Sequence, residues 1–194
     1  MTVMSMSKEM DAGDIISQAK LDIGEDEILD SLMNRMSLLG RDLLLETLPS
    51  IIDGTCKYIK QDESLVTFGY NITREEEKIN FNSSVRDVYN HIRGLSSHPG
   101  AYCIFNGKRM KIYKAVILDN SDNLDKYRDG EIIKIGKDGF VVKCSDGLLM
   151  ILEIGLEGKS RCMVSDFLNG IKVENIVGKV LNSWMIEKIV FLKS

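Results

Sequence analysis

The most regular hydrophobic pattern in the chain lies between residues 26 and 53. Apolar residues recur there at steps of three and four, which is the spacing of one face of a helix. They are Ile28, Leu32, Met36, Leu39, Leu43, Leu44, Leu48 and Ile51. Acidic residues crowd the first turn, where the helix dipole favours them, and Gly54 can supply a left-handed cap at the other end. We therefore predict an amphipathic helix from Asp26 to Asp53, which Pro49 is expected to kink or to end early.

Short alternating runs precede this helix. Residues 2–6 alternate like a strand, residues 11–14 carry a turn signal, and Ile15 and Ile16 begin a second strand. An amphipathic helix of this length needs a sheet of several strands beneath it, and two short strands cannot supply one. We expect either that another chain provides the sheet or that the front of a domain is missing.

From residue 55 to residue 80 the chain is polar and charged, which is typical of a solvated linker. A short helix over 84–93 follows, with Ser83 or Ser84 as its cap and Gly94 at its end. Next come five strand-like runs separated by glycine turns. These runs are 101–105, 108–118, 131–135, 140–144 and 148–154. The pattern predicts a small closed barrel, and the oligonucleotide-binding (OB) barrel is one member of that class.

Composition narrows the class of protein. The 194 residues are 44% hydrophobic and 28% charged, which is enough apolar material for a core. No apolar run approaches the ~18 residues of a membrane span, and no secretory signal opens the chain, so we expect a cytoplasmic protein without a membrane partner. The cysteines lie far apart and there are two histidines, so neither a metal site nor a disulfide framework is expected.

Charge is distributed unevenly along the sequence. Residues 1–90 hold 9 Lys/Arg and 17 Asp/Glu, whereas residues 91–172 hold 13 and 10. The predicted barrel is therefore mildly basic, and Tyr102 and Tyr113 lie among its cations. The candidate RNA-binding residues are Arg93, Lys108, Arg109, Lys111, Lys114, Lys159 and Arg161. Contact with an RNA backbone and simple solubilisation of a barrel exterior are equally consistent with this composition.

Few residues suggest catalysis by their spacing. Asp11 and Asp14 flank a glycine in a turn between two predicted strands, where α/β enzymes often place acid–base groups. A solvated turn is the simpler interpretation of that spacing. His91 and His98 have no Ser or Cys partner in a nucleophile motif, so hydrolase chemistry has no support.

Five segments share the motifs of one known family, in the same order. Residues 2–14 contain T-x-M-x-M and D-x-G-D, and residues 38–48 continue with LLG…LL…TL. Residues 61–81 carry QDE…TF…ITREE…INF, residues 92–102 carry IRGL…PGAY, and residues 158–170 carry GKSRCM…DFLNG. Together these segments resemble the methionyl-tRNA formyltransferases over most of residues 2–170.

The resemblance implies transfer of a formyl group from 10-formyltetrahydrofolate to the amino group of methionyl-initiator tRNA, in translation initiation. It implies a Rossmann-like domain that carries the folate site and the chemistry, and an OB-like barrel that holds the tRNA. It assigns the catalytic aspartate of D-x-G-D to Asp14. That carboxylate would orient a histidine, balance its charge and help to remove a proton as the amine attacks the formyl carbon.

The chain also departs from the family pattern. The family's N-x-H-x-S-x-L-P segment, which supplies the partner Asn and His, does not occur in the 194 residues. The opening strands and most of the folate pocket are missing as well. We therefore expect a fragment that is inactive alone, with a separately encoded N-terminal half as a candidate partner. A fragment of a sugar-nucleotide N-formyltransferase and a non-catalytic RNA-binding module remain as alternatives.

The expected architecture is α+β. Residues 1–60 would be the end of a Rossmann-like catalytic domain, formed by two strands and the long helix. Residues 61–80 would be a linker, residues 81–172 an OB-like barrel, and residues 173–194 a tail of unclear structure.

Overall fold

The structure is a computed structural model that describes residues 1–119, 124–169 and 176–182. The chain divides into two compact units, residues 1–71 and residues 72–194, and each is described by itself. Within the described ranges, no helix is both long enough and apolar enough to cross a membrane.

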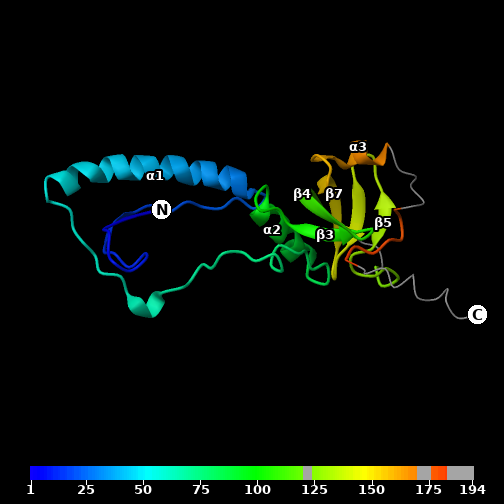
Figure 1. Cartoon of the computed structure of the whole chain (residues 1–194), viewed down its shortest axis with the longest axis horizontal. Coiled ribbons are helices and arrows are strands. Elements are labelled where there is room, and N and C mark those ends of the chain that lie inside the picture. The colour runs from blue at the N-terminus through cyan, green and yellow to red at the C-terminus, as the bar shows by residue number, and fades with distance from the viewer. Residues whose placement is uncertain (120–123, 170–175, 183–194) are drawn as a thin grey trace, which may run out of the picture. The chain divides into compact units, whose positions relative to one another are not determined.

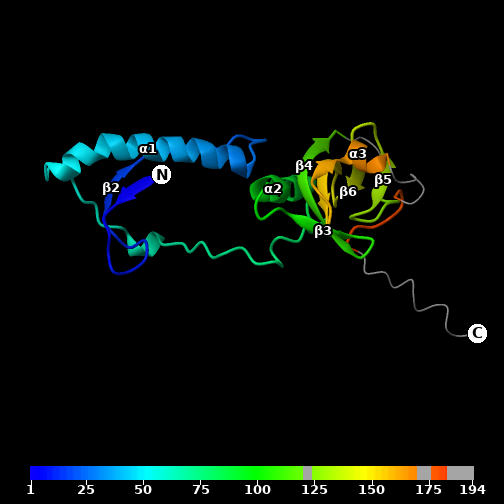
Figure 2. The ribbon, with the colours of Figure 1, turned by 45° about the horizontal axis from the view of Figure 1, so that its top comes forward.

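The first unit consists of a hairpin and a long helix. Strands β1 (Thr2–Met4) and β2 (Ile15–Gln18) pair antiparallel, and helix α1 spans Leu29–Ile52 (Figure 2). The predicted helix is confirmed with a start three residues later. We expected that Pro49 would kink the helix or end it early. It does not end the helix early, because the helix continues to Ile52 and the Asp53 N–H bonds the Pro49 carbonyl at 2.9 Å. Gly54 adopts the expected left-handed conformation, with a φ of 68°.

Helix α1 has one covered stripe and one exposed stripe. On the covered side it packs on the hairpin, where the Thr47 and Ser17 hydroxyls lie 2.7 Å apart. On the opposite side Leu38, Leu45 and Ile52 are 54%, 60% and 74% exposed. These three residues recur every seven positions, so they share one face of the helix. The two-stranded hairpin therefore covers one side of α1 and leaves a second apolar stripe open.

The segment between the two predicted domains is mostly exposed. Residues 62–76 are exposed throughout, with a short 3-10 helix η1 at Glu63–Leu65. Its ends are held in place. Ile59 exchanges two backbone hydrogen bonds of 2.8 Å with Ile15, and Ile79, only 1% exposed, donates its N–H to the Tyr102 carbonyl.

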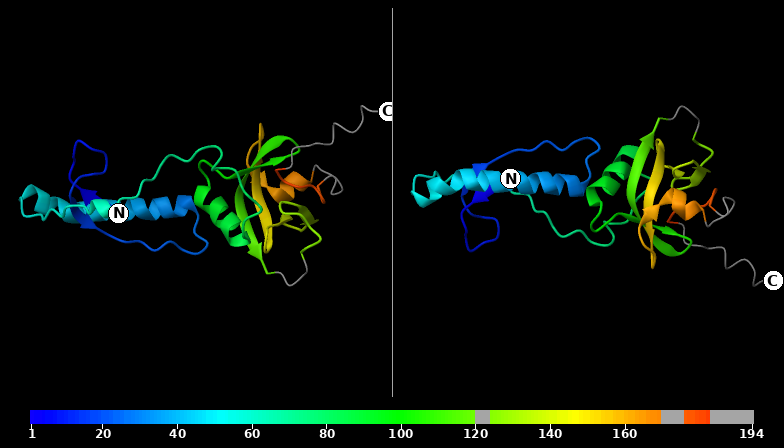
Figure 3. Two further views of the ribbon diagram at one scale, coloured as in Figure 1. Left: turned by 90° about the horizontal axis from the view of Figure 1, so that it is seen from below. Right: turned by 90° about the horizontal axis from the view of Figure 1, so that it is seen from above.

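A curled antiparallel sheet forms the second unit (Figures 1 and 3). Its strands follow the order β3-β4-β7-β6-β5, and β8 pairs with β7. They span Tyr102–Phe105 (β3), Lys108–Leu118 (β4), Ile132–Ile135 (β5), Phe140–Lys143 (β6), Leu148–Leu156 (β7) and Cys162–Met163 (β8). All five predicted strand runs are therefore present. The β3–β4 turn has positive φ at Asn106 and Gly107, as a two-residue hairpin requires.

The two edges of this sheet are joined by the segment 176–182. Its backbone bonds β5 at Ile132 in both directions, and the Leu181 N–H bonds the Gly130 carbonyl at 2.8 Å. At its other end the Asn182 N–H bonds the Ile104 carbonyl of β3 at 2.9 Å. Ile176 is fully buried and Leu181 is 3% exposed. This part of the tail over 173–194 thus belongs to the core, and the remainder of that tail lies outside the described residues.

Two helices cover the curled sheet. Helix α2 (Val85–Leu95) buries Val88 and Ile92 and is capped by the Ser84 hydroxyl, which accepts the Asp87 N–H at 3.1 Å. Helix α3 (Val164–Leu168) follows β8 directly. The core between these elements is apolar and extends from Ile79 and Phe81 to Leu181.

Candidate nucleic-acid interface

The outer face of β3, β4 and β7 collects the basic residues, and the burial pattern of β4 explains how. Met110 and Ile112 point into the core, and the next buried residue of the strand is Ala115, three positions later. An ordinary strand alternates every two residues, so this step marks the irregular register between β4 and β7. It leaves both Tyr113 and Lys114 outside the core.

Two arginines stack on tyrosines of this face. The Arg109 guanidinium carbon lies 4.6 Å from the centre of the Tyr102 ring, and that of Arg161 lies 4.3 Å from the centre of the Tyr113 ring. Gly155 makes room for the second ring, because a Cβ there would lie 3.0 Å from a Tyr113 ring carbon. Cation–π contact of this kind holds a guanidinium in place without removing its charge.

The other predicted basic residues fall into two groups. Lys108, Lys114 and Lys159 are exposed on or beside β4 and the β7–β8 connection. Lys111 lies on the same outer face as Arg109, and its ammonium donates to the Pro99 carbonyl. Arg93 is separate, since it is half-buried on α2 and donates to the Asn90 side chain at 2.8 Å. The structure therefore places four of the seven candidates on β4 and two more, Lys159 and Arg161, on the β7–β8 connection.

Glu153 is an acidic residue of this face that pairs with one of the stacked arginines. Its carboxylate accepts two hydrogen bonds from Arg161, at 2.6 and 2.8 Å. The Arg161 guanidinium holds the pKa of the Glu153 carboxyl below its usual value, and Lys114 acts in the same direction. Glu153 is therefore ionised at neutral pH and pairs with one of the two stacked arginines.

The turn that carries Asp14 lies in the other unit and is held by backbone contacts. The Ser5 N–H donates to the Asp14 carbonyl at 2.9 Å, and the Asp14 N–H donates to the Ser5 hydroxyl at 3.0 Å. The Gln61 side chain donates to the Asp11 and Gly13 carbonyls, both at 2.7 Å. Gly13 is required here, because a Cβ would lie 1.8 Å from the Ser5 carbonyl oxygen.

The Asp14 side chain is half-buried at the end of this hairpin. Among the described residues, none donates a hydrogen bond to its carboxylate. The two histidines belong to residues 72–194 and have local partners: the His91 ring bonds the Glu77 carbonyl at 3.3 Å, and the His98 ring bonds the Ser97 hydroxyl at 3.1 Å. Over the described ranges, no group of three His, Cys, Asp or Glu side chains is arranged to hold a metal ion.

Comparison with known sequences identifies the family. The model of the formyl transferase C-terminal domain matches residues 71–172, which is more than half of the chain. The chain belongs to the formyl transferase family. It is 42% identical to the methionyl-tRNA formyltransferase of Streptococcus thermophilus over 179 residues, which cover 92% of this chain and 56% of that relative. It is also 42% identical to the methionyl-tRNA formyltransferase of Staphylococcus epidermidis strain RP62A over 181 residues, which cover 93% of this chain and 57% of that relative. The chain thus spans a little over half the length of these relatives.

Solved structures show a similar fold. A variant of HypX from Aquifex aeolicus has a TM-score of 0.69 at 18% identity, over 94% of this chain and 33% of that one. An N-formyltransferase from Helicobacter canadensis has a TM-score of 0.57 at 20% identity, over 77% of this chain and 54% of that one. At these identities the likeness concerns the fold alone.

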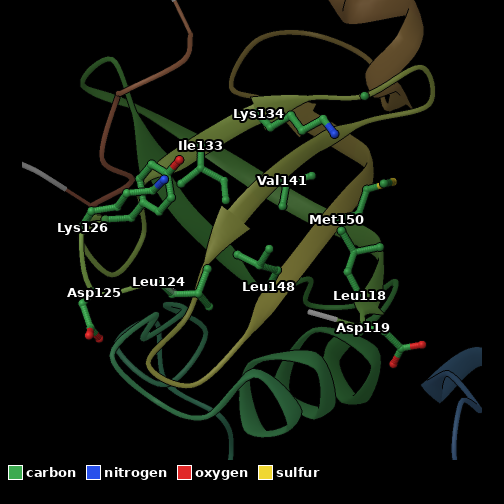
Figure 4. Close-up of a pocket in the computed structure, with 12 residues that line it drawn as sticks. Leu118, Asp119, Leu124, Asp125, Lys126, Ile133, Lys134, Val141, Leu148 and Met150 are labelled. Atoms are coloured by element: carbon green, nitrogen blue, oxygen red, sulfur yellow. The ribbon is translucent and has the colours of Figure 1, made fainter. Parts of the chain in front are cut away.

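In this formyl transferase chain, all seven predicted basic residues lie within the matched domain, and Asp14 lies outside it. A separate groove of about 1000 Å³ lies beside β5, β6 and β7 (Figure 4). Its walls include Val141 and Leu148, while Asp125 and Lys126 lie at its rim. Because acidic and basic side chains share this rim, the groove is a poor match for a phosphate backbone.

Several residues of the interface carry no signal in the sequence. Glu153 and Gly155 look like ordinary positions of a strand. Glu153 pairs with Arg161, which lies beyond the next turn, and Gly155 makes room for Tyr113 because of the register of β7 with β4. Gln61 resembles a linker residue, although it holds the Asp14 turn. A glycine inside a strand often marks the close approach of another group, and Gly155 is the clue that could have indicated the Tyr113 site.

Proposed function

We propose that this chain is the C-terminal part of a methionyl-tRNA formyltransferase and that its curled sheet, an OB-like barrel, binds the phosphate backbone of methionyl-initiator tRNA. One observation carries the proposal: two arginines stacked on tyrosines, with Lys111 between them, on one face of β3, β4 and β7. The identity of 42% to relatives of that name supports it.

The chemistry of this face suits a phosphate backbone better than base edges. Guanidinium groups bind phosphate through a planar fork of N–H donors, and stacking on an aromatic ring limits the entropy lost on binding. Folded RNA is recognised largely through its shape, phosphates and 2′-hydroxyls. Lys108, Lys114 and Lys159 add exposed positive charge around the stacked pairs, which attracts the RNA over a distance set by the ionic strength.

In the proposed reaction, Asp14 assists formyl transfer from 10-formyltetrahydrofolate to the amino group of the methionine. Its half-buried carboxylate is free of protein partners among the described residues, and its position at the end of a short strand suits an acid–base group. Residues 1–60 would be the end of a Rossmann-like catalytic domain, and the open stripe of Leu38, Leu45 and Ile52 on α1 is consistent with a missing layer. The rest of the folate site would lie in the part of the relatives that this chain does not span. Because translation initiation uses this tRNA, the proposed place of action is the cytoplasm.

The binding proposal is tested with uncharged initiator tRNA, by filter retention across 50 to 200 mM salt. The wild-type chain is compared with Arg109→Gln and with Lys134→Gln, a matched loss of one charge on β5. We expect Arg109→Gln to weaken binding and to reduce the slope of log K against log salt by about 0.7–0.9, the value of one phosphate contact. Lys134→Gln should leave the slope unchanged. Absence of binding by the folded chain at 50 mM salt, or equal effects of the two variants, would overturn the proposal.

The catalytic proposal has its own test. The purified chain alone should not formylate methionyl-initiator tRNA, because it lacks the N-x-H-x-S-x-L-P segment. A full-length relative in which the residue aligned with Asp14 is changed to Asn should lose turnover while still binding tRNA. Formylation by this chain alone would contradict the assignment of the missing groups to another segment.

A further inference from the structure

The two arginine–tyrosine stacks differ in what else the arginine binds. Arg161 makes two hydrogen bonds to the Glu153 carboxylate, at 2.6 and 2.8 Å. Arg109 stacks on Tyr102, and within the described residues its guanidinium forms no ion pair. Its backbone N–H, and not its side chain, donates to Glu157 at 3.2 Å. One stacked arginine is therefore open to an anion, and the other already holds one.

The bonds of Arg161 occupy the part of the guanidinium that a phosphate would use. A carboxylate that accepts from Nε and from a terminal nitrogen fills the same fork that binds two phosphate oxygens. The Glu153 side chain is 20% exposed and that of Arg161 is 44% exposed, so the pair lies at the surface and not in the core. A ligand can reach this pair, but it must compete with Glu153.

We propose that Glu153 restrains Arg161, so that Arg109 provides the arginine contact to RNA while Arg161 is held back by an internal carboxylate. This inference rests on the proposed function, because it assigns a specificity-determining residue to the same face. Glu153 occupies the position of a phosphate, lowers the affinity of the face for polyanions and confines tight contact to RNA that reaches Arg109.

Neutralising Glu153 should therefore remove this carboxylate from a guanidinium that is already stacked on Tyr113. Each new phosphate contact adds about 0.7–0.9 to the salt slope. The gain in affinity should accordingly be about threefold larger at 50 mM than at 200 mM salt. This gain in affinity should disappear when Arg161 is absent. A gain that came only from the loss of one negative charge would not depend on Arg161.

The experiment is a double-mutant cycle of Glu153→Gln and Arg161→Gln, with initiator tRNA as the probe and the full chain as the protein. Glu157→Gln is the matched control, because it removes one negative charge nearby and its amide oxygen can still accept the Arg109 N–H. We expect Glu153→Gln to tighten binding and steepen the salt slope, Arg161→Gln to change binding little, and the double variant to lose the gain. Circular dichroism confirms that each variant is folded.

The outcomes separate the inference from the function on which it rests. Salt-sensitive binding by the wild-type chain with no gain in Glu153→Gln overturns the inference alone. The inference is also overturned if Glu153→Gln still tightens binding in the Arg161→Gln background, or if Glu157→Gln tightens binding as much. In either case the gain in affinity comes from the change in net charge and not from Arg161. If none of the variants binds tRNA at low salt, the proposed function fails and the inference fails with it.

Discussion

Asn182 anchors the segment 176–182 at the β3 edge of the curled sheet, and its replacement by Ala should destabilise the second unit strongly. Its side-chain amide donates to the Ile79 carbonyl at 2.8 Å and accepts the Ile104 N–H at 2.9 Å. Its backbone has a φ of 65°, a conformation that Asn tolerates better than most residues. The residue therefore binds both β3, at Ile104, and the segment before α2, at Ile79.

The expected cost follows from these contacts. Ile79 is 1% exposed, so its carbonyl would lose its partner in a place that water reaches poorly. A buried polar group left without a partner costs about 1–3 kcal/mol, and Asn182→Ala leaves two such groups, the Ile79 carbonyl and the Ile104 N–H. Ala also tolerates a left-handed backbone less well than Asn does. We expect Asn182→Ala to lower the free energy of unfolding by about 3–4 kcal/mol.

Two further variants divide this cost into its causes. Asn182→Gly loses the same hydrogen bonds but relieves the backbone, so it should be about 1 kcal/mol more stable than Asn182→Ala. Asn182→Asp keeps an acceptor for the Ile104 N–H and should lie between Asn182→Ala and the wild type. Urea unfolding followed by circular dichroism gives the free energies, and amide exchange at Ile104 gives a local readout. A loss below about 0.5 kcal/mol for Asn182→Ala would refute the claim that this residue anchors the segment 176–182 to β3.

Three other predictions follow from local geometry. Gly13→Ala should loosen the Asp14 turn, seen as faster amide exchange across the hairpin, because the new Cβ would lie 1.8 Å from a carbonyl oxygen; unchanged exchange would contradict this. Burial raises the pKa of the Cys103 thiol and raises that of Cys144 to about 12, so both should resist alkylation at pH 8 in the native chain and react once it is unfolded. Because Arg161 lowers the pKa of Glu153, their pairing contributes stability above the usual carboxyl pKa and loses it as pH falls through the lowered value. Arg161→Gln should accordingly raise the Glu153 pKa in a carboxyl NMR titration, and an unchanged value would argue against the ion pair.

Local periodicity was enough to predict most of the regular elements. The three- and four-residue spacing predicted α1, and alternating runs between glycine turns predicted the five strands β3 to β7, because both signals arise within one element. Tertiary contacts decided the details. The end of α1 beyond Pro49 is held by backbone hydrogen bonds to the Pro49, Ser50 and Ile51 carbonyls, which the sequence pattern does not report.

The parts that could not be predicted depend on contacts between distant residues. Gly178 and Lys179 interrupt the apolar residues of the segment 176–182, so it does not resemble a strand, yet it bonds Ile132 on one edge and Ile104 on the other. The basic candidates were predictable as residue types, but their grouping arises from the register of β4 with β7. Arg93 looked equivalent to the others and lies apart on α2, because helix periodicity places it beside Asn90.

The most direct test of the account is to map the tRNA contact on the isotope-labelled chain. Arginine side-chain and backbone NMR signals would be followed as initiator tRNA is added at 50 mM salt and as salt is then raised to 200 mM. The account predicts perturbations at Arg109 and Tyr102 and across the outer face of β4, and their reversal by salt. Perturbations confined to the groove beside β5 and β6, at Lys126 and Lys134, would contradict it.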